Sequence, residues 1–119
     1  MKLKDYEKAE TTNIDFKIDL ETQKPKSWLK SVSAFANTKG GIILFGIDDE
    51  THEHIGVKNL KRNSEKISEL INARIEPLPR YEINCFEDDG KDFIELQIGD
   101  GPLTPYYYVS DGAKYVFKK

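Results

Sequence analysis

The sequence predicts an α+β domain in which two helices pack on one mixed β-sheet. Three observations support this fold class. Residues 14–47 read as strand, helix and strand, a second helical pattern follows, and the remaining patterns all alternate as strands do. A strand–helix–strand opening allows a parallel pair, whereas strands joined by short turns form antiparallel hairpins. A chain of 119 residues with 38% apolar residues can form one hydrophobic core. We therefore expect residues 1–119 to form a single domain.

The first strand is expected at residues 14–19, where isoleucine and phenylalanine alternate with charged residues. Such alternation places the apolar side chains on a buried face and the charged side chains on an exposed face. Pro25 then begins a helix with an apolar stripe, because proline is favoured in the first helical turn. The residues of that stripe are Trp28, Leu29, Val32, Phe35 and Ala36.

The next strand is expected at residues 42–47, an uninterrupted apolar run that is short enough for a strand covered on both faces. The stretch Asn37–Gly41 separates it from the helix, since asparagine and glycine accept the left-handed conformation that ends helices. Gly40 and Gly41 also allow a close backbone approach. Asp48 and Asp49 end the strand.

A second helix is expected to begin at Asn63 or Ser64, either of which can cap it, and to end before Pro77 and Pro79. Its apolar stripe consists of Ile67, Leu70, Ile71 and Ile75. Residues 81–85 and 93–98 then alternate on either side of a turn and predict a hairpin. The segments YYYV and KYVF flank an Asp111–Gly112 turn and predict another hairpin.

Composition excludes some classes of protein. Eighteen basic and 21 acidic residues give a net charge of −3, which disfavours indiscriminate adhesion to nucleic acid or anionic membranes. No run of about 18 apolar residues exists, and the N-terminal stretch lacks a signal-peptide core, so we expect a cytoplasmic protein without membrane contacts. Cys85, the single cysteine, is expected to be a buried thiol.

Three stretches of the sequence resemble the Schlafen-type AlbA-like domain, which stands at the N-terminus of many bacterial transcriptional regulators. Glu10 followed by Asp15-Phe16-Lys17 is similar to that family's first motif, in which glutamate usually stands at position 15. The stretch SAFANTKGGIILFGIDD is similar to its central motif, and PYYYVSDGAKYVFKK to its closing segment, although Phe117 replaces a common arginine. A Gly-Ser tail that normally follows is absent, so we expect the chain to be the N-terminal part of a longer protein.

The resemblance implies a nucleic-acid-binding domain, with DNA as the expected partner, in a transcriptional regulator. It also implies an alternative, because some Schlafen relatives are metal-dependent endoribonucleases that use three carboxylates. Carried onto this chain, those carboxylates are Glu10, Asp15 and Asp48, with Mg²⁺ or Mn²⁺ as the metal. Because Alba-like proteins commonly form dimers, a homodimer and a role as an oligomerisation module are a further alternative. We expect binding rather than catalysis.

The residues themselves also point to two of these carboxylates, Asp15 and Asp48. Asp15 and Lys17 are two apart on a strand and share a face, so the carboxylate can hold a hard cation while the ammonium neutralises a phosphate. Asp48 can complete an oxygen-ligand site if the two strands adjoin. The alternatives are a solvated strand face for Asp15 and Lys17, and a polar turn opened by Asp48 and Asp49.

Nucleic-acid contacts are expected at two further places, while the choice between DNA and RNA stays open. The turn formed by Asn37, Thr38, Lys39, Gly40 and Gly41 either simply stops the helix or cradles a phosphate with its N–H groups and the lysine. The cluster Lys58, Lys61, Arg62 and Lys66 is either a solvated face or an edge that contacts phosphates. Tyrosines 106–108 either belong to the core or stack on bases.

Overall fold

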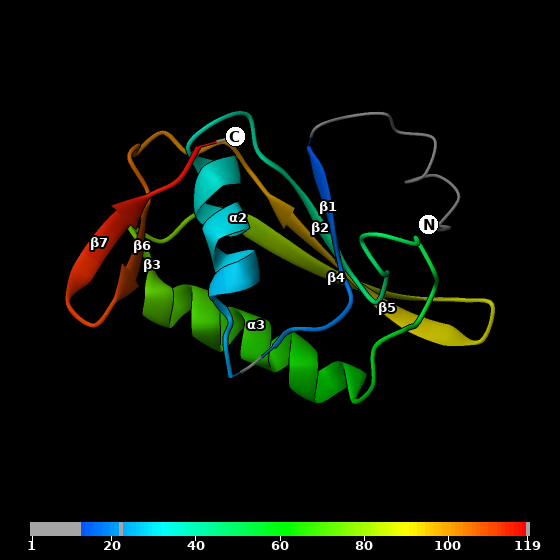
Figure 1. Cartoon of the computed structure of the whole chain (residues 1–119). Helices are drawn as coiled ribbons and strands as arrows, with labels where there is room; N and C mark the ends of the chain where they lie inside the picture. The colour runs from blue at the N-terminus through cyan, green and yellow to red at the C-terminus, as the bar shows by residue number, and fades with distance from the viewer. Residues whose placement is uncertain (1–12, 22, 119) are drawn as a thin grey trace.

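The computed structural model describes residues 13–21 and 23–118. A four-stranded sheet runs through the molecule in the order β1-β2-β5-β4 (Figure 1). Its strands are β1 (Ile14–Lys17), β2 (Gly41–Phe45), β4 (Tyr81–Asp88) and β5 (Lys91–Ile98). The pair β1 and β2 is parallel and the other two pairs are antiparallel. The mixed sheet and the β4–β5 hairpin are therefore confirmed.

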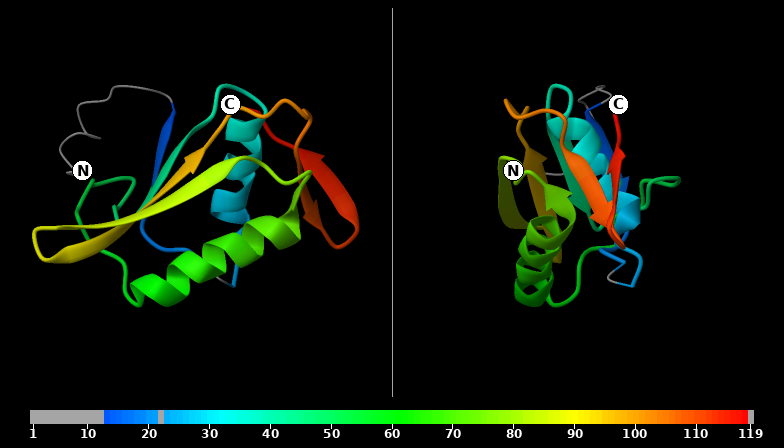
Figure 2. Two further views of the ribbon diagram at one scale, coloured as in Figure 1. Left: turned by 180° about the vertical axis from the view of Figure 1, so that it is seen from behind. Right: turned by 90° about the vertical axis from the view of Figure 1, so that its left-hand side faces the viewer.

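The two helices, α2 (Lys26–Ala36) and α3 (Leu60–Arg74), cover one face of this sheet. The strands lie in front of α2 when the molecule is viewed from behind, so no helix of the described residues lies on the other face (Figure 2). The side chains between helices and sheet are almost fully buried, as the apolar stripe of α2 predicts; examples are Trp28, Phe45 and Ile71. The Trp28 ring meets Phe45 edge-on with 5.5 Å between ring centres, and its N–H donates to the carbonyl of Leu20. Neither helix is long and apolar enough to cross a membrane, nor is any other helix in the described residues.

The helix-free face carries a smaller apolar cluster. Leu44 and Phe93 are fully buried at its centre, and partly buried side chains surround them; these are Ile14, Phe16, Ile42 and Phe86. Ile18 was expected to join this face, but it is 45% exposed. That expectation is wrong because β1 ends at Lys17, where the chain leaves the sheet.

A second, three-stranded sheet was not predicted as a separate unit. It has the order β3-β6-β7 and consists of β3 (Ile75–Glu76), β6 (Tyr107–Ser110) and β7 (Ala113–Val116). The predicted hairpin around Asp111 and Gly112 is confirmed as β6–β7. Tyr106 and Tyr108 are only 1% and 5% exposed, which confirms the core interpretation for these two rings.

The predicted start of the second helix is wrong. Helix α3 begins at Leu60, and the N–H of Asn63 already bonds to the carbonyl of Asn59, as in a continuing helix. The side chain of Asn63 donates to the carbonyl of Lys58, and the hydroxyl of Ser64 donates to Lys61, so neither caps the helix. At the other end, Ile75 has left the helix and opens β3.

Cys85 is exposed, not buried as expected. It lies on β4, an edge strand that pairs only with β5 among the described residues. Partial desolvation by nearby atoms still raises the pKa of its thiol. A thiol with a raised pKa remains protonated near neutral pH and is therefore a weak nucleophile.

The turn that follows α2 is held by Asn37. Its amide donates to the carbonyls of Tyr106 at 2.9 Å and Phe117 at 3.0 Å, and its oxygen accepts the N–H of Tyr106 at 2.6 Å. The expected close approach at the glycines is confirmed, since a Cβ on Gly40 would lie 2.4 Å from the carbonyl oxygen of Ile98. The same residue has φ +80°, which favours glycine.

We predict that Asn37→Ala lowers the free energy of unfolding by about 2–4 kcal/mol, because three hydrogen bonds are lost and their backbone partners stay enclosed. Urea unfolding followed by circular dichroism measures this loss. Asn63→Ala is the matched control, since it removes one exposed amide bond and should cost about 1 kcal/mol or less. Equal losses for the two variants would contradict a special role for Asn37.

Candidate functional site

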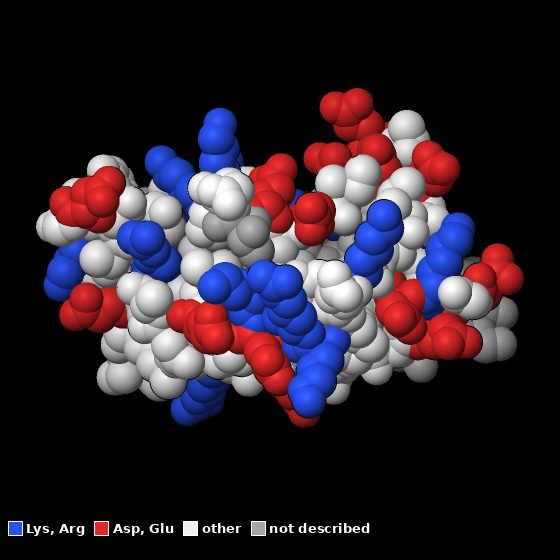
Figure 3. Space-filling view, turned by 90° about the horizontal axis from the view of Figure 1, so that it is seen from below, with Lys and Arg blue, Asp and Glu red and all other residues white. Residues whose placement is uncertain are grey.

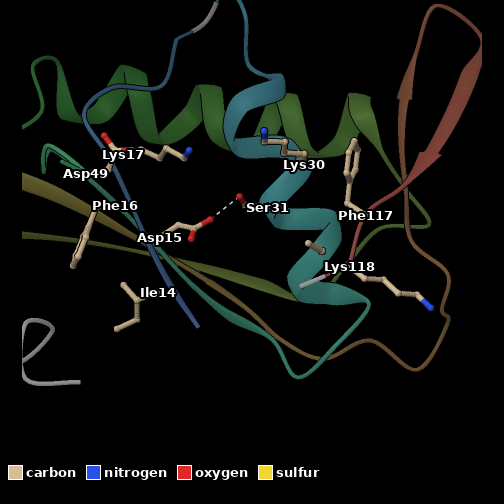
Figure 4. Close-up of a pocket in the computed structure, with 10 residues that line it drawn as sticks. Ile14, Asp15, Phe16, Lys17, Lys30, Ser31, Asp49, Phe117 and Lys118 are labelled. Carbon is tan, nitrogen blue, oxygen red and sulfur yellow. Dashed lines mark hydrogen bonds between the residues drawn. The ribbon is translucent and has the colours of Figure 1, made fainter. Parts of the chain in front are cut away.

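A groove of about 550 Å³ lies between β1 and α2, with the C-terminal segment at its end (Figure 4). It combines apolar walls with acidic, basic and hydroxyl groups. Its lining residues are Ile14, Asp15, Phe16, Lys17, Lys30, Ser31, Ala34, Asp49, Phe117 and Lys118. The volume falls within the range of about 300–1,000 Å³ that is usual for small-molecule sites.

Asp15 lies at the centre of this groove. It pairs in register with Ile43 of β2 and, like that residue, faces the helices rather than the opposite side of the sheet. The hydroxyl of Ser31 on α2 donates to its carboxylate at 2.6 Å. Asp15 and Lys17 share one face, as predicted, but both are half-buried against α2, so they do not form the solvated face that was the alternative.

Three lysines border the groove: Lys17 from β1, Lys30 from α2 and Lys118 from the C-terminal segment. In Figure 4, the Lys17 and Lys30 side chains lie on one side of the Asp15–Ser31 hydrogen bond and Lys118 lies on the other. No ion pair or hydrogen bond of these three ammonium groups is recorded among the described residues. Their charges are therefore available to an anion.

The sequence analysis assigned no role in a site to Lys30, Ser31 or Phe117, which line the groove. One signal for α2 was present, because Ser31 and Ser33 interrupt a helix face that is otherwise apolar, and both are almost fully buried. A buried hydroxyl on a predicted core face needs a polar partner, and for Ser31 that partner is Asp15. Phe117 and Lys118 reach the groove because Asn37 bonds to the carbonyl of Phe117.

The structure does not bring the three predicted carboxylates together among the described residues. Glu10 lies outside the described residues. The condition that the two strands adjoin is met, because β1 and β2 pair directly. Asp48 does not line the groove, and its Oδ1 accepts the N–H groups of Glu50 at 2.8 Å and Thr51 at 3.0 Å, as in a polar turn. Within residues 13–21 and 23–118, no group of three acidic, histidine or cysteine side chains is placed to hold a metal ion.

The hydrogen bonds around Asp48 also change its acidity. The N–H groups of Thr51 and Glu50 stabilise the charged carboxylate and hold its pKa below the ordinary value of 3.8. Asp49, in contrast, is exposed and lines the groove together with Asp15 and Lys17. The second aspartate of the pair is thus the one that reaches the groove.

The turn from Asn37 to Gly41 uses most of its polar groups internally. The N–H groups of Asn37, Thr38 and Gly40 all bond to carbonyls of α2, and the Thr38 hydroxyl donates to the carbonyl of Ala34. Lys39 remains exposed beside a second hollow of about 470 Å³, which Gly40 and Gly41 also line. A phosphate at this turn would therefore meet the Lys39 side chain rather than a cradle of N–H groups.

The cluster at the start of α3 is mostly open to solvent. Lys58, Lys61 and Arg62 are exposed, whereas Lys66 pairs with Glu69 at 3.3 Å. A hollow of about 160 Å³ is lined by Asn59, Arg62, Asn63 and Lys66. The underside of the molecule shows basic side chains gathered near its middle with acidic side chains on both sides (Figure 3).

Comparison with known proteins identifies a matching family and a similar protein. The family model described as Schlafen, AlbA_2 matches residues 10–119. The chain is 30% identical over 80 residues to a Ureaplasma parvum protein named uncharacterized ATP-binding protein UU034, and the match covers 65% of this chain but only 22% of that protein.

Solved structures that share the fold include the following two. The N-terminal domain of a Nitrosomonas europaea protein described as related to the ATP-dependent DNA helicase RecG superposes with a TM-score of 0.70 and 18% identity. That match covers 93% of this chain and 79% of the other. The DIP2311 protein of Corynebacterium diphtheriae gives a TM-score of 0.62 and 18% identity, covering 91% of this chain and 22% of the other.

We predict that the stabilising effect of the Asp48 charge disappears in acid. Because the pKa is lowered in the folded chain, the effect is complete above the unfolded pKa of about 3.9 and is lost as the pH falls through the folded value. Asp48→Asn keeps an oxygen for the same N–H groups but removes the charge. The stability difference between wild type and this variant should be constant from about pH 7 to 5 and shrink below about pH 4.

Urea unfolding of both proteins at several pH values measures that difference. A difference that stays flat down to about pH 2.5 would show that the charge of Asp48 does not stabilise the turn.

Proposed function

The chain belongs to the Schlafen, AlbA_2 family, and on this premise we propose that it is a nucleic-acid-binding domain of a transcriptional regulator. DNA is the proposed partner, which the likeness to a DNA helicase-related domain supports. The chain spans 22% of the Ureaplasma parvum protein that it matches, which supports further domains C-terminal to it in a longer protein. A cytoplasmic location is part of the same proposal.

The observation that carries the proposal is a set of cationic side chains without acidic partners. No ion pair is recorded within the described residues for the ammonium or guanidinium groups of Lys17, Lys39, Lys58, Lys61 and Arg62. Ion pairs do occur elsewhere, at Lys66–Glu69 and Lys114–Glu76. Cations that lack a carboxylate neighbour can each neutralise a phosphate and release its counterion.

The arrangement favours phosphate contacts over base readout. Lysine and arginine near a helix start contact the backbone of a duplex and set its orientation, but they do not by themselves read sequence. Sequence choice would then lie in other domains of the longer protein. The net charge of −3 limits adhesion outside these contacts.

A homodimer is a weaker proposal. The edge strand β7 exposes Tyr115 and Val116 to 44% each, and a second copy could pair with that edge. Sedimentation at several protein concentrations tests it, since a monomer at all of them would remove this alternative.

A metal-dependent endoribonuclease is the second candidate, and the presence of Asp15, Asp49 and Lys17 in one groove favours it. The described residues do not complete a three-carboxylate site, because Asp48 lies outside the groove and forms a turn.

We predict binding that weakens steeply with salt, with a slope of about −0.9 in log K against log salt for each phosphate neutralised. Lys61→Glu and Arg62→Glu should each weaken binding by on the order of tenfold at about 0.1 M salt, for all duplex sequences alike. Fluorescence anisotropy with a labelled duplex measures both effects.

Lys114→Glu is the matched control, because it changes the net charge equally but lies in β7, at the opposite end of the molecule from the start of α3 (Figure 1). Its exposed pair with Glu76 contributes little to stability. Equal weakening by all three variants would point to net charge rather than a binding surface, and absent binding to both DNA and RNA at low salt would refute the proposal.

We also predict that the purified chain binds structured RNA without cutting it when Mg²⁺ or Mn²⁺ is added. Gel electrophoresis of labelled RNA after incubation measures this. Metal-dependent cleavage that both Asp15→Asn and Asp48→Asn abolish, with RNA binding retained, would contradict this prediction and establish the second candidate instead.

A further inference from the structure

We propose that the groove between β1 and α2 binds one nucleoside phosphate, either a free nucleotide or the terminal nucleotide of a nucleic-acid strand. If the ligand is the end of a nucleic-acid strand, this inference rests on the proposed nucleic-acid-binding function. It goes beyond that function in assigning a separate, single-nucleotide site to the groove. The cluster at the start of α3 has no part in this site.

The cations of the groove call for an anionic ligand. Lys17 and Lys30 approach from β1 and α2, on the same side of the Asp15–Ser31 hydrogen bond (Figure 4). Two lysines from different elements at one end of a groove provide a site for a phosphate group, because each ammonium offers three donors without a fixed direction.

The carboxylate of Asp15 makes inorganic phosphate alone a poor ligand for the groove. Asp15 lines the same groove as the lysines, and its carboxylate would repel an anion that filled the groove. A carboxylate accepts hydrogen bonds from hydroxyl groups, as Asp15 does from Ser31. The ligand that satisfies both groups carries a phosphate next to hydroxyls, as a sugar phosphate does.

The remaining walls call for a flat apolar group. Phe117 and Ala34 line the groove beside these polar side chains. Phe117 is half-buried against Tyr108, with 6.4 Å between ring centres, so its position is fixed by the core. A nucleobase can stack on such a ring whatever its identity. Phosphate, hydroxyls and base together describe a nucleoside phosphate.

The size of the groove agrees with this ligand class. About 550 Å³ lies in the middle of the range for sites that enclose a small molecule, and it is too small for a section of duplex. A nucleotide within a strand could enter only if its base were unstacked, which is easiest at a strand end.

Isothermal titration with adenosine monophosphate and with inorganic phosphate tests the ligand class. The nucleotide should bind at least tenfold more tightly than phosphate, and Lys30→Glu should abolish that binding. Lys24→Glu is the control, since Lys24 is an exposed lysine that does not line the groove. Asp15→Asn keeps an acceptor for Ser31 but should strengthen phosphate binding and so reduce the preference for the nucleotide about tenfold.

Anisotropy with a blunt duplex and with the same duplex carrying a single-stranded overhang separates the two sources. Tighter binding of the overhang that Lys30→Glu removes, with blunt-duplex binding unchanged, identifies the strand end. Nucleotide binding without any overhang preference identifies a free nucleotide.

The remaining outcomes overturn the inference or the proposed function separately. If the blunt duplex binds but neither the nucleotide nor the overhang engages the groove, the inference fails and the proposed function stands. If the nucleotide binds but no nucleic acid does, the proposed function fails. The inference then stands with a free nucleotide as the ligand of the groove. Phosphate binding as tight as nucleotide binding would also overturn the inference.

Discussion

The hydrogen bonds of Asn37 are the constraint on which the arrangement of the candidate site depends. One side chain at the end of α2 holds both the start of β6, through the N–H and carbonyl of Tyr106, and the segment after β7, through the carbonyl of Phe117. It thereby fixes the small sheet against the helix. Because Phe117 and Lys118 follow directly, the same contacts bring the C-terminal segment to a groove whose other walls come from β1 and α2.

Local periodicity predicted most of the fold, and it failed where tertiary context decides. The stripe of α2 and the apolar run of β2 were correct because burial imposes those patterns directly. The second sheet was missed because β3 has only two residues and continues the apolar stripe of α3 through Ile75. The exposure of Cys85 depends on how much of β4 other elements cover, and strand alternation alone does not give this.

The site was predictable only in part, for a similar physical reason. Strand periodicity placed Asp15 and Lys17 on one face correctly, but it could not tell that α2 covers that face, because both faces of this sheet carry apolar residues. Ser31 and Lys118 join Asp15 through contacts between distant parts of the sequence. The turn at Asp48 was one of two alternatives open from the sequence, and hydrogen bonds to Glu50 and Thr51 distinguish them.

The central claim is that a nucleic acid contacts the cationic side chains at the start of α3, with further contacts at Lys17 and Lys39. A titration of the isotope-labelled chain with a short duplex, followed by amide chemical shifts, tests this most directly. The account predicts that the largest changes fall at residues 58–66, with smaller ones near Lys17 and Lys39. Changes confined to the helix-free face around Ile42 and Phe86, or to the β6–β7 hairpin, would contradict it.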